Sequence, residues 1–242
     1  MAYTSWRGVI GVIKPTMRPG STEEMIRLLP EGIGVIPIFL DVRKGSRQEF
    51  KGAIQAYEPK IKELADQEVD IIMPEGAGPF VMAGFEFEKK IVGQWERKYK
   101  RPMVTSCISQ VAAMKALKIK RPVLASYTTG VTNTERDTYF AKAGFNVAGQ
   151  VVVSLDDFQR AGEMSPHEIY AQIKREVLKV KRPDGILMRG SGWRSLECIE
   201  WLEQDLGIPV VHAVTARNWM AQKILRVMQP VHGVGRLLVE LP

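Results

Sequence analysis

The sequence predicts an α/β protein with two similar Rossmann-like half-domains, and three observations support this prediction. Short apolar runs alternate with helical patterns, which is typical of parallel sheets flanked by helices. This alternation restarts once along the chain. The segments DIIMPEGAG (70–78) and DGILMRGSG (184–192) repeat one pattern, an acidic residue, an apolar run and a charged residue before Gly-x-Gly. We therefore expect half-domains at 1–119 and 120–242, related by pseudo-twofold symmetry, with a cleft between them and terminal segments that can cross over.

The elements of the first half-domain follow from apolar spacing and punctuating residues. The apolar run at 8–15 is typical of a strand buried on both faces, and Pro37 indicates an edge strand. Ser21 and Glu24 have the spacing of a capping box. In chain order, we expect a strand at 8–15, a helix at 21–29, a strand at 33–42, a helix at 47–67, a strand at 69–74, a helix at 80–97, a strand at 102–106 and a helix at 107–117.

The second half-domain repeats this order. Its clearest start signal is Ser165 at the N-cap, Pro166 at the first helical position and Glu168 at the third. In chain order, we expect a strand at 121–129, a helix at 132–143, a strand at 145–155, a helix at 165–180, a strand at 184–188, a helix at 194–205, a strand at 208–213 and a helix at 215–228. The two Gly-x-Gly segments fall at matching points of the two series.

Composition excludes several classes of protein. No apolar run approaches the roughly 18 to 20 residues that span a bilayer, and the N-terminus MAYTSWRG lacks a secretory signal, so we expect a cytoplasmic protein without a membrane partner. The net charge of +7 comes from scattered basic residues, which favours small anions over nucleic acid as partners. The two cysteines lack C-x-x-C spacing and the three histidines do not cluster, so no metal site or disulfide is expected.

The two Gly-x-Gly loops are the first candidates for a binding site. Folds of this class bind ligands beyond the carboxyl ends of their strands, so both loops would border one cleft. Small residues allow backbone N–H groups to approach and hold an anion such as a carboxylate. The alternative is that both loops only make tight turns. Neither loop is a dinucleotide fingerprint or a P-loop, because the third Gly and the Gly-Lys-Ser/Thr are absent.

Five segments, spread over nearly the whole chain, resemble one superfamily. They are LLPEGIGV (28–35), VDIIMPEGAG (69–78), KRPMVTS (100–106), DGILMRGSGWRSLE (184–197) and LGIPVVHAVTARNWMA (206–221). The most specific part is GSGWRSLE followed by GIPVV and a Trp. On these segments the chain resembles the aspartate/glutamate racemase superfamily, and within it the branch of maleate isomerases and arylmalonate decarboxylases.

This resemblance implies an enzyme that uses no cofactor. One or two cysteines of the family stand just after the two strands that carry the repeated segments, where they move a proton next to a carboxylate or attack as a nucleophile. In this chain the first cysteine position falls on Gly76 and the second on Gly190, or on Glu75 and Arg189 if the register slips by one residue. Neither position holds a thiol.

The residues of this chain suggest what replaces the thiols. Cys198 is most simply a core residue, whereas Cys107 could face the cleft from a helix N-terminus, which would lower its pKa. Glu75 is the natural general base, because burial in an apolar cleft brings the pKa of a carboxylic acid towards neutrality. Arg189 could bind a substrate carboxylate as a bidentate fork. The alternative is a structural salt bridge between Glu75 and Arg189 across the pseudo-twofold axis.

Further candidates stand at other strand ends. Tyr127 matches a tyrosine common in the family and could bind a carboxylate or protonate an intermediate; alternatively, it packs between the halves. His212 titrates near neutral pH and could act as acid or base, or it is a hydrogen-bonded structural residue. Lys14 or Arg18 could supply charge beside Thr16. The residues expected to bind the substrate are Thr16, Gly76, Ala77, Gly78, Thr128, Thr129, Arg189, Gly190, Ser191 and Gly192.

We therefore expect a cofactor-independent lyase or isomerase that acts on a small carboxylic acid through a carbanion-like or enediolate-like intermediate, with Glu75, His212 and Tyr127 as catalytic residues. Two alternatives remain open. One is a hydrolase or hydratase in which Glu75 activates water, and the other is a non-catalytic protein that binds a small acid. A homo-oligomer is also expected, since closed dimers are the commonest assembly.

Overall fold

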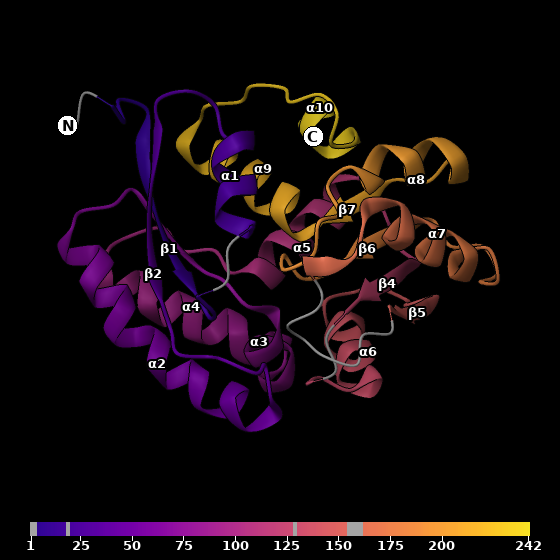
Figure 1. Cartoon of the computed structure of the whole chain (residues 1–242). Coiled ribbons are helices and arrows are strands. Elements are labelled where there is room, and N and C mark those ends of the chain that lie inside the picture. The colour runs from indigo at the N-terminus through magenta and orange to yellow at the C-terminus, as the bar shows by residue number, and fades with distance from the viewer. Residues whose placement is uncertain (1–3, 18–19, 128–129, 154–161) are drawn as a thin grey trace.

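The computed structural model describes residues 4–17, 20–127, 130–153 and 162–242 and contains two parallel sheets, each flanked by helices (Figure 1). The strands are β1 (Gly8–Lys14), β2 (Ile33–Phe39), β3 (Ile71–Pro74), β4 (Pro122–Ser126), β5 (Gly149–Val152), β6 (Gly185–Met188) and β7 (Val210–His212). The first sheet has the order β2-β1-β3 and the second has the order β5-β4-β6-β7. The predicted α/β class is confirmed, whereas the division at residues 119 and 120 stays a prediction.

The helices fall between the strands in the predicted alternation. They are α1 (Ser21–Leu28), α2 (Arg47–Asp66), α3 (Ala77–Ala83), α4 (Phe85–Tyr99), α5 (Ser106–Ala116), α6 (Asn133–Lys142), α7 (Pro166–Val177), α8 (Cys198–Leu206), α9 (Ala213–Leu225) and α10 (Arg236–Glu240). Within the described residues, no helix has both the length and the apolar character needed to cross a bilayer.

The first half of the chain differs from the prediction in one strand and one helix. The strand expected at 102–106 is reduced to a single bridge between Met103 and Ile72. The helix expected at 80–97 is two helices, because Gly84 interrupts it with a φ of 95° that side chains disfavour. The edge position of β2 is as Pro37 predicted, since β2 pairs only with β1 among the described strands.

The helix starts give one confirmation and one correction. Ser165 and Glu168 form the predicted capping box at the start of α7. The capping box predicted from Ser21 and Glu24 is wrong, because Gly20 occupies the N-cap of α1 and makes no side-chain cap. Ser21 is instead the first helical residue, and it is buried.

Helices α5 and α9 connect the two halves. Helix α5 lies at the centre of the molecule, where it packs against α9 and against β6 and β7 of the second sheet (Figure 1). Helix α9, which follows the last strand of the second sheet, packs against α1 of the first half. Helices α5 and α9 thus join the elements around the two sheets, whereas the predicted crossover of terminal segments stays a prediction.

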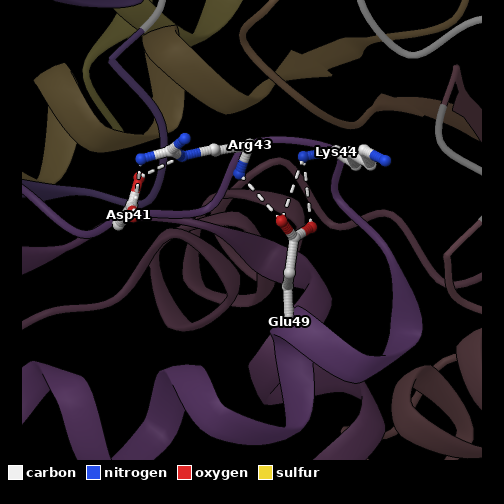
Figure 2. A network of polar contacts seen from close by, with 4 residues as sticks. All are labelled: Asp41, Arg43, Lys44 and Glu49. Carbon is white, nitrogen blue, oxygen red and sulfur yellow. Dashed lines mark hydrogen bonds and ion pairs between the residues drawn. The ribbon is translucent and has the colours of Figure 1, made fainter.

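The loop between β2 and α2 is fixed by a carboxylate of the helix it enters. Glu49 accepts hydrogen bonds from the backbone N–H groups of Arg43 (3.0 Å) and Lys44 (3.1 Å), and Arg43 pairs with Asp41 at 2.8 Å (Figure 2). These bonds satisfy backbone donors of the loop that precedes the N-cap Ser46. The loop thereby holds Val42 in the wall of the cavity described below.

The two helix starts lead to a test of the corrected capping. Ser165→Ala should lower the free energy of unfolding by about 1 kcal/mol, because the first turn of α7 loses its cap. Ser21→Ala, which removes no cap, should change it by less than about 0.5 kcal/mol. Urea denaturation of both variants measures this. Equal losses in the two variants would contradict the assignment of Gly20 as the N-cap of α1.

Candidate active site

A cavity lies at the carboxyl ends of β1, β3, β4 and β6, and both Gly-x-Gly loops border it. It encloses about 870 Å³ of empty space, its open mouth included. The predicted residues that line it are Thr16, Glu75, Gly76, Ala77, Gly78, Tyr127, Arg189, Gly190, Ser191 and Gly192. Lys14, which was expected to supply charge beside Thr16, also lines it, and the lining residues that sequence reasoning did not single out are Pro15, Ser21, Val42, Phe50, Ser106, Gln110, Val131 and Ala213.

The two glycine loops bring backbone close to the cavity at positions that exclude a side chain. Gly76 and Gly190 have φ values of 97° and 89°. A Cβ on Gly190 would lie 2.4 Å from Cε1 of Tyr127, and one on Gly76 would lie 2.9 Å from Cγ of Pro15. The Tyr127 hydroxyl accepts a hydrogen bond from the N–H of Gly192 at 2.9 Å. Tyr127 therefore holds the second loop in place as well as lining the cavity.

Glu75 forms a buried ion pair with Arg217, a residue of α9 that sequence reasoning did not single out. The exposed fractions of the two side chains are 3% and 1%. The contact is an ion pair rather than an aligned hydrogen bond, because Oε1 of Glu75 has no hydrogen-bond partner of good geometry in the described structure. The alternative pairing of Glu75 with Arg189 is therefore wrong, and the link between the halves runs to Arg217.

Lys14 brings a second charge to the cavity wall from the end of β1. Its side chain is buried, and its Nζ lies 5.7 Å from the centre of the Phe39 ring. Burial lowers the pKa of Lys14, the negative charge of Glu75 opposes this shift, and Arg217 adds to it. An amine whose proton is more easily lost thus stands in the same cavity as a carboxylate.

The guanidinium of Arg189 lies in an inner cluster rather than beside Glu75. It stands 5.4 Å from the ring centre of Phe140, and burial lowers its pKa. Burial raises the pKa of Glu88 to about 7, although hydroxyl groups that include that of Tyr139 donate to it. Cys107 lies in the same cluster, and burial raises its pKa. The cluster keeps Cys107 protonated, so the structure gives no support to a reactive thiol there.

His212 lies outside the lining of the cavity and serves as the N-cap of α9. Its Nδ1 accepts from the N–H of Val214 at 3.2 Å, and its Nε2 lies 3.0 Å from the hydroxyl of Ser195. Burial, and then the nearby charge of Arg217, lower the pKa of His212 to about 3. The histidine is neutral near pH 7, and the structural interpretation of its role fits these contacts better than the catalytic one. Its catalytic role stays an untested prediction.

Two lining residues come from α5. Ser106 follows the N-cap residue Thr105, and Gln110 lies one turn further along the helix. Gln110 is fully buried, and neither its Nε2 nor its Oε1 has a hydrogen-bond partner in the described part of the chain. The signal for Ser106 was in the sequence, since KRPMVTS puts a strand end and a helix cap together, whereas Gln110 lies beyond that segment.

Three of the predicted residues, Arg18, Thr128 and Thr129, lie outside the described residues. Cys198 is buried at the start of α8, and its Sγ lies 3.0 Å from the carbonyl oxygen of Pro166, which accords with a core residue. Among the residues that the structure describes, no group of three His, Cys, Asp or Glu side chains could hold a metal ion.

Comparisons with known proteins agree with this architecture. The sequence model of the arylmalonate decarboxylase family matches residues 10–238. The maleate isomerase Iso from Pseudomonas putida S16 superposes with a TM-score of 0.87, at 18% identity, over 97% of this chain and 99% of that one. An arylmalonate decarboxylase gives 0.83, at 19% identity, over 95% and 98%. The Nocardia farcinica maleate cis-trans isomerase bound to TRIS gives 0.87, at 19% identity, over 96% and 98%. No match was found among the curated proteins.

The buried ion pair leads to a stability test. Arg217→Met should lower the free energy of unfolding by about 3 to 5 kcal/mol, because it leaves the Glu75 carboxylate buried without its partner. The double variant Glu75→Gln/Arg217→Met should recover more than half of that loss, since neither charge remains. Urea denaturation of the three proteins measures both steps. Additive losses in the double variant would contradict a direct interaction.

The neutral state of His212 leads to a test by pH. Its folded pKa of about 3 lies below the ordinary value of 6.5, so its contribution to stability is fully present above about pH 6.5 and is lost as pH falls towards 3. Over the middle of this range the loss approaches about 1.4 kcal/mol per pH unit. His212→Asn retains a capping acceptor and should flatten the decline between pH 6 and 4. Parallel stability curves for the two proteins would contradict this assignment.

Proposed function

Because the chain belongs to the arylmalonate decarboxylase family, we propose that it is a lyase or isomerase that acts on a small carboxylic acid without a catalytic thiol. The resemblance that the sequence predicted is thereby confirmed, while the activity is our proposal. The observation that carries it is the composition of the cavity wall. Lys14, Glu75 and both glycine loops line one cavity, whereas Cys107 and Cys198 are buried elsewhere.

The substrate carboxylate binds at the glycine loops in this proposal. Both glycine loops lie at strand ends and line the cavity, and the donors in this proposal are the backbone N–H groups of Ala77 and Ser191, since the N–H of Gly192 already donates to Tyr127. Hydroxyl groups of Thr16 and Ser191, which line the same cavity, add donors. Such preorganised donors stabilise the negative charge that collects on oxygen in an enediolate. The loops thus favour the intermediate over the ground state.

The charged pair Lys14 and Glu75 takes over the proton transfers. In a decarboxylation, the bond between the α-carbon and one carboxylate breaks, carbon dioxide leaves, and the electron pair remains as an enediolate. The ammonium group of Lys14 then gives a proton to the α-carbon, and solvent restores it. In an isomerisation, Glu75 removes a proton from carbon and Lys14 returns one at another position, after which exchange with solvent takes the proton from Glu75 and restores the one on Lys14. Both routes conserve charge and atoms without a thiol.

One observation favours a non-catalytic alternative. Arg217 holds Glu75 in an ion pair, and His212 lies outside the lining, so the predicted acid and base pair does not meet in the cavity. A protein that only binds a small acid would need no proton carrier. The hydrolase or hydratase alternative also remains open, because an ionised Glu75 could activate water. Turnover measurements separate these alternatives.

The first test is turnover of small mono- and dicarboxylates by the wild type, by Glu75→Gln and by Lys14→Met. One or more acids should be converted, and the variant that loses the proton carrier of that reaction should be slower by at least about 100-fold in kcat. Lys14→Met is expected to be the slow variant for a decarboxylation and Glu75→Gln for a proton abstraction from carbon. Product analysis by nuclear magnetic resonance in D₂O identifies the reaction and the carbon that receives the proton.

The matched control is Cys107→Ser combined with Cys198→Ser. This variant should retain activity within about threefold, because neither thiol takes part. Loss of activity in the folded control would contradict the thiol-free mechanism. If an acid stabilises the wild type against heat but none is converted, the non-catalytic alternative replaces the proposal.

A further inference from the structure

Glu88 joins three elements in the interior of the protein. It lies on α4 with its side chain fully buried, and its carboxylate accepts hydrogen bonds from the hydroxyl of Thr105, the N-cap of α5, and from that of Tyr139 on α6. The Thr105 hydroxyl also accepts from the N–H of Ile108 at 3.1 Å. A protonated Glu88 can keep both contacts by donating to the hydroxyl of Tyr139, since a phenol both donates and accepts. The carboxyl group can therefore change its charge without a change in packing.

The groups that face Glu88 make it the member of this cluster that titrates near neutral pH. Burial raises its pKa to about 7, and the two hydroxyl donors and then the positive charge of Arg189 oppose this shift. Tyr57 from α2, Tyr139 from α6 and Cys107 from α5 also interact with its charge, and burial raises the pKa of each, so all three are neutral near pH 7. Helix α3, which also packs against α4, carries no titratable side chain. Arg189 keeps its charge at this pH and is thus the cation that balances an ionised Glu88.

Arg189 also belongs to the wall of the cavity. It lines the cavity directly before the second glycine loop, and its backbone N–H donates to the carbonyl oxygen of Ala125 at 2.8 Å. Ser106, the residue after the Thr105 cap, lines the cavity as well. The inner cluster and the cavity are thus neighbours. Because the effective dielectric constant inside a protein is lower than that of water, a carboxylate in the cavity acts on the charges of Arg189 and Glu88 without touching either.

We propose that Glu88 takes up a proton when a carboxylate binds in the cavity, so that the charge of Arg189 is balanced by the ligand instead of by Glu88. This inference rests on the proposed function, because it takes the cavity as the site of the substrate carboxylate. Glu88 is a positioning residue here, since it acts through Arg189 and does not touch the ligand. Below pH 7 Glu88 is neutral and the ligand meets an unbalanced cation, whereas above pH 7 two carboxylates compete for one cation. Affinity should therefore fall as pH rises through 7.

Isothermal titration of the full chain with succinate measures this uptake directly. Titrations in buffers with different ionisation enthalpies give the number of protons taken up for each ligand bound. A tenfold preference of succinate for the protein with a neutral Glu88 corresponds to about 0.4 of a proton at pH 7 and to a dissociation constant that rises about fivefold between pH 6 and pH 8. Succinamide, the uncharged match, should cause no uptake. This comparison needs no variant.

Glu88→Gln provides the second measurement, because it keeps the shape of the side chain and is neutral at every pH. It should bind succinate within about twofold of wild type at pH 6 and about fivefold more tightly than wild type at pH 8, and its proton uptake at pH 7 should be lower by about 0.4. A residue with only a structural role would weaken binding at both pH values when replaced. Lys14 can also take up a proton, because burial lowers its pKa. This contribution is common to the two proteins and cancels in the comparison.

Glu24→Gln is the matched control. Burial also raises the pKa of Glu24 to about 7, but this residue of α1 lines a neighbouring cavity and not the candidate active site. The variant should take up as many protons as wild type. Retained uptake in Glu88→Gln, lost uptake in Glu24→Gln, or binding of succinate by wild type without uptake would overturn the inference and leave the carboxylate site intact. Absence of binding by succinate, maleate and malonate alike would overturn the proposed function itself.

Discussion

The ion pair between Glu75 and Arg217 is the contact on which the arrangement of the cavity depends. It joins the end of β3 in the first half to α9, which follows the last strand of the second half. Because both side chains are almost fully buried, each charge would carry a large desolvation penalty without the other. The position of α9 and the position of the first glycine loop therefore depend on each other. The charges of Glu75 and Arg217 also act on the pKa of Lys14, the first raising it and the second lowering it.

The duplicated scaffold supplies symmetry, and the chemistry comes from departures from it. Glu75 and Arg189 stand at equivalent strand ends, yet one faces Arg217 and the other turns into a cluster with Glu88. Gln110 and Arg217 stand at equivalent places on crossing helices, yet only the arginine has a partner among the described residues. Two halves with the same backbone thus give a cavity whose two sides hold different groups. Such a cavity can orient an unsymmetrical substrate.

Much of the fold follows from the sequence because its signals are local. The order of elements, the edge strand with Pro37, and the capping box at Ser165 depend on residues close together in the chain. The false capping box at Ser21 shows the limit of such signals, since the preceding glycine took the N-cap. The glycine loops could be placed at one cavity because strand ends of parallel sheets meet there.

The partners of the site residues could not be predicted in the same way. Arg217 is separated from Glu75 by most of the second half, and only the crossing of α9 brings them together. His212 was predicted as a catalytic residue from its position at a strand end. The orientation of its imidazole ring, however, depends on its contacts with Ser195 and with the first turn of α9. Gln110 gave no signal of its own, because an unpartnered amide can be recognised only when its surroundings are known.

A carboxylate and an amine cannot replace a pair of thiols in every reaction. Two thiols have equal pKa values in equal surroundings, so either can give or take a proton, as a racemisation requires. Here Arg217 holds Glu75 in an ion pair, while burial lowers the pKa of Lys14 and so favours loss of its proton. The two groups therefore stand in different surroundings, and Lys14 is the one suited to donate a proton. A reaction that needs a single proton delivery to carbon, such as decarboxylation, suits this fixed division better than one that must run equally in both directions.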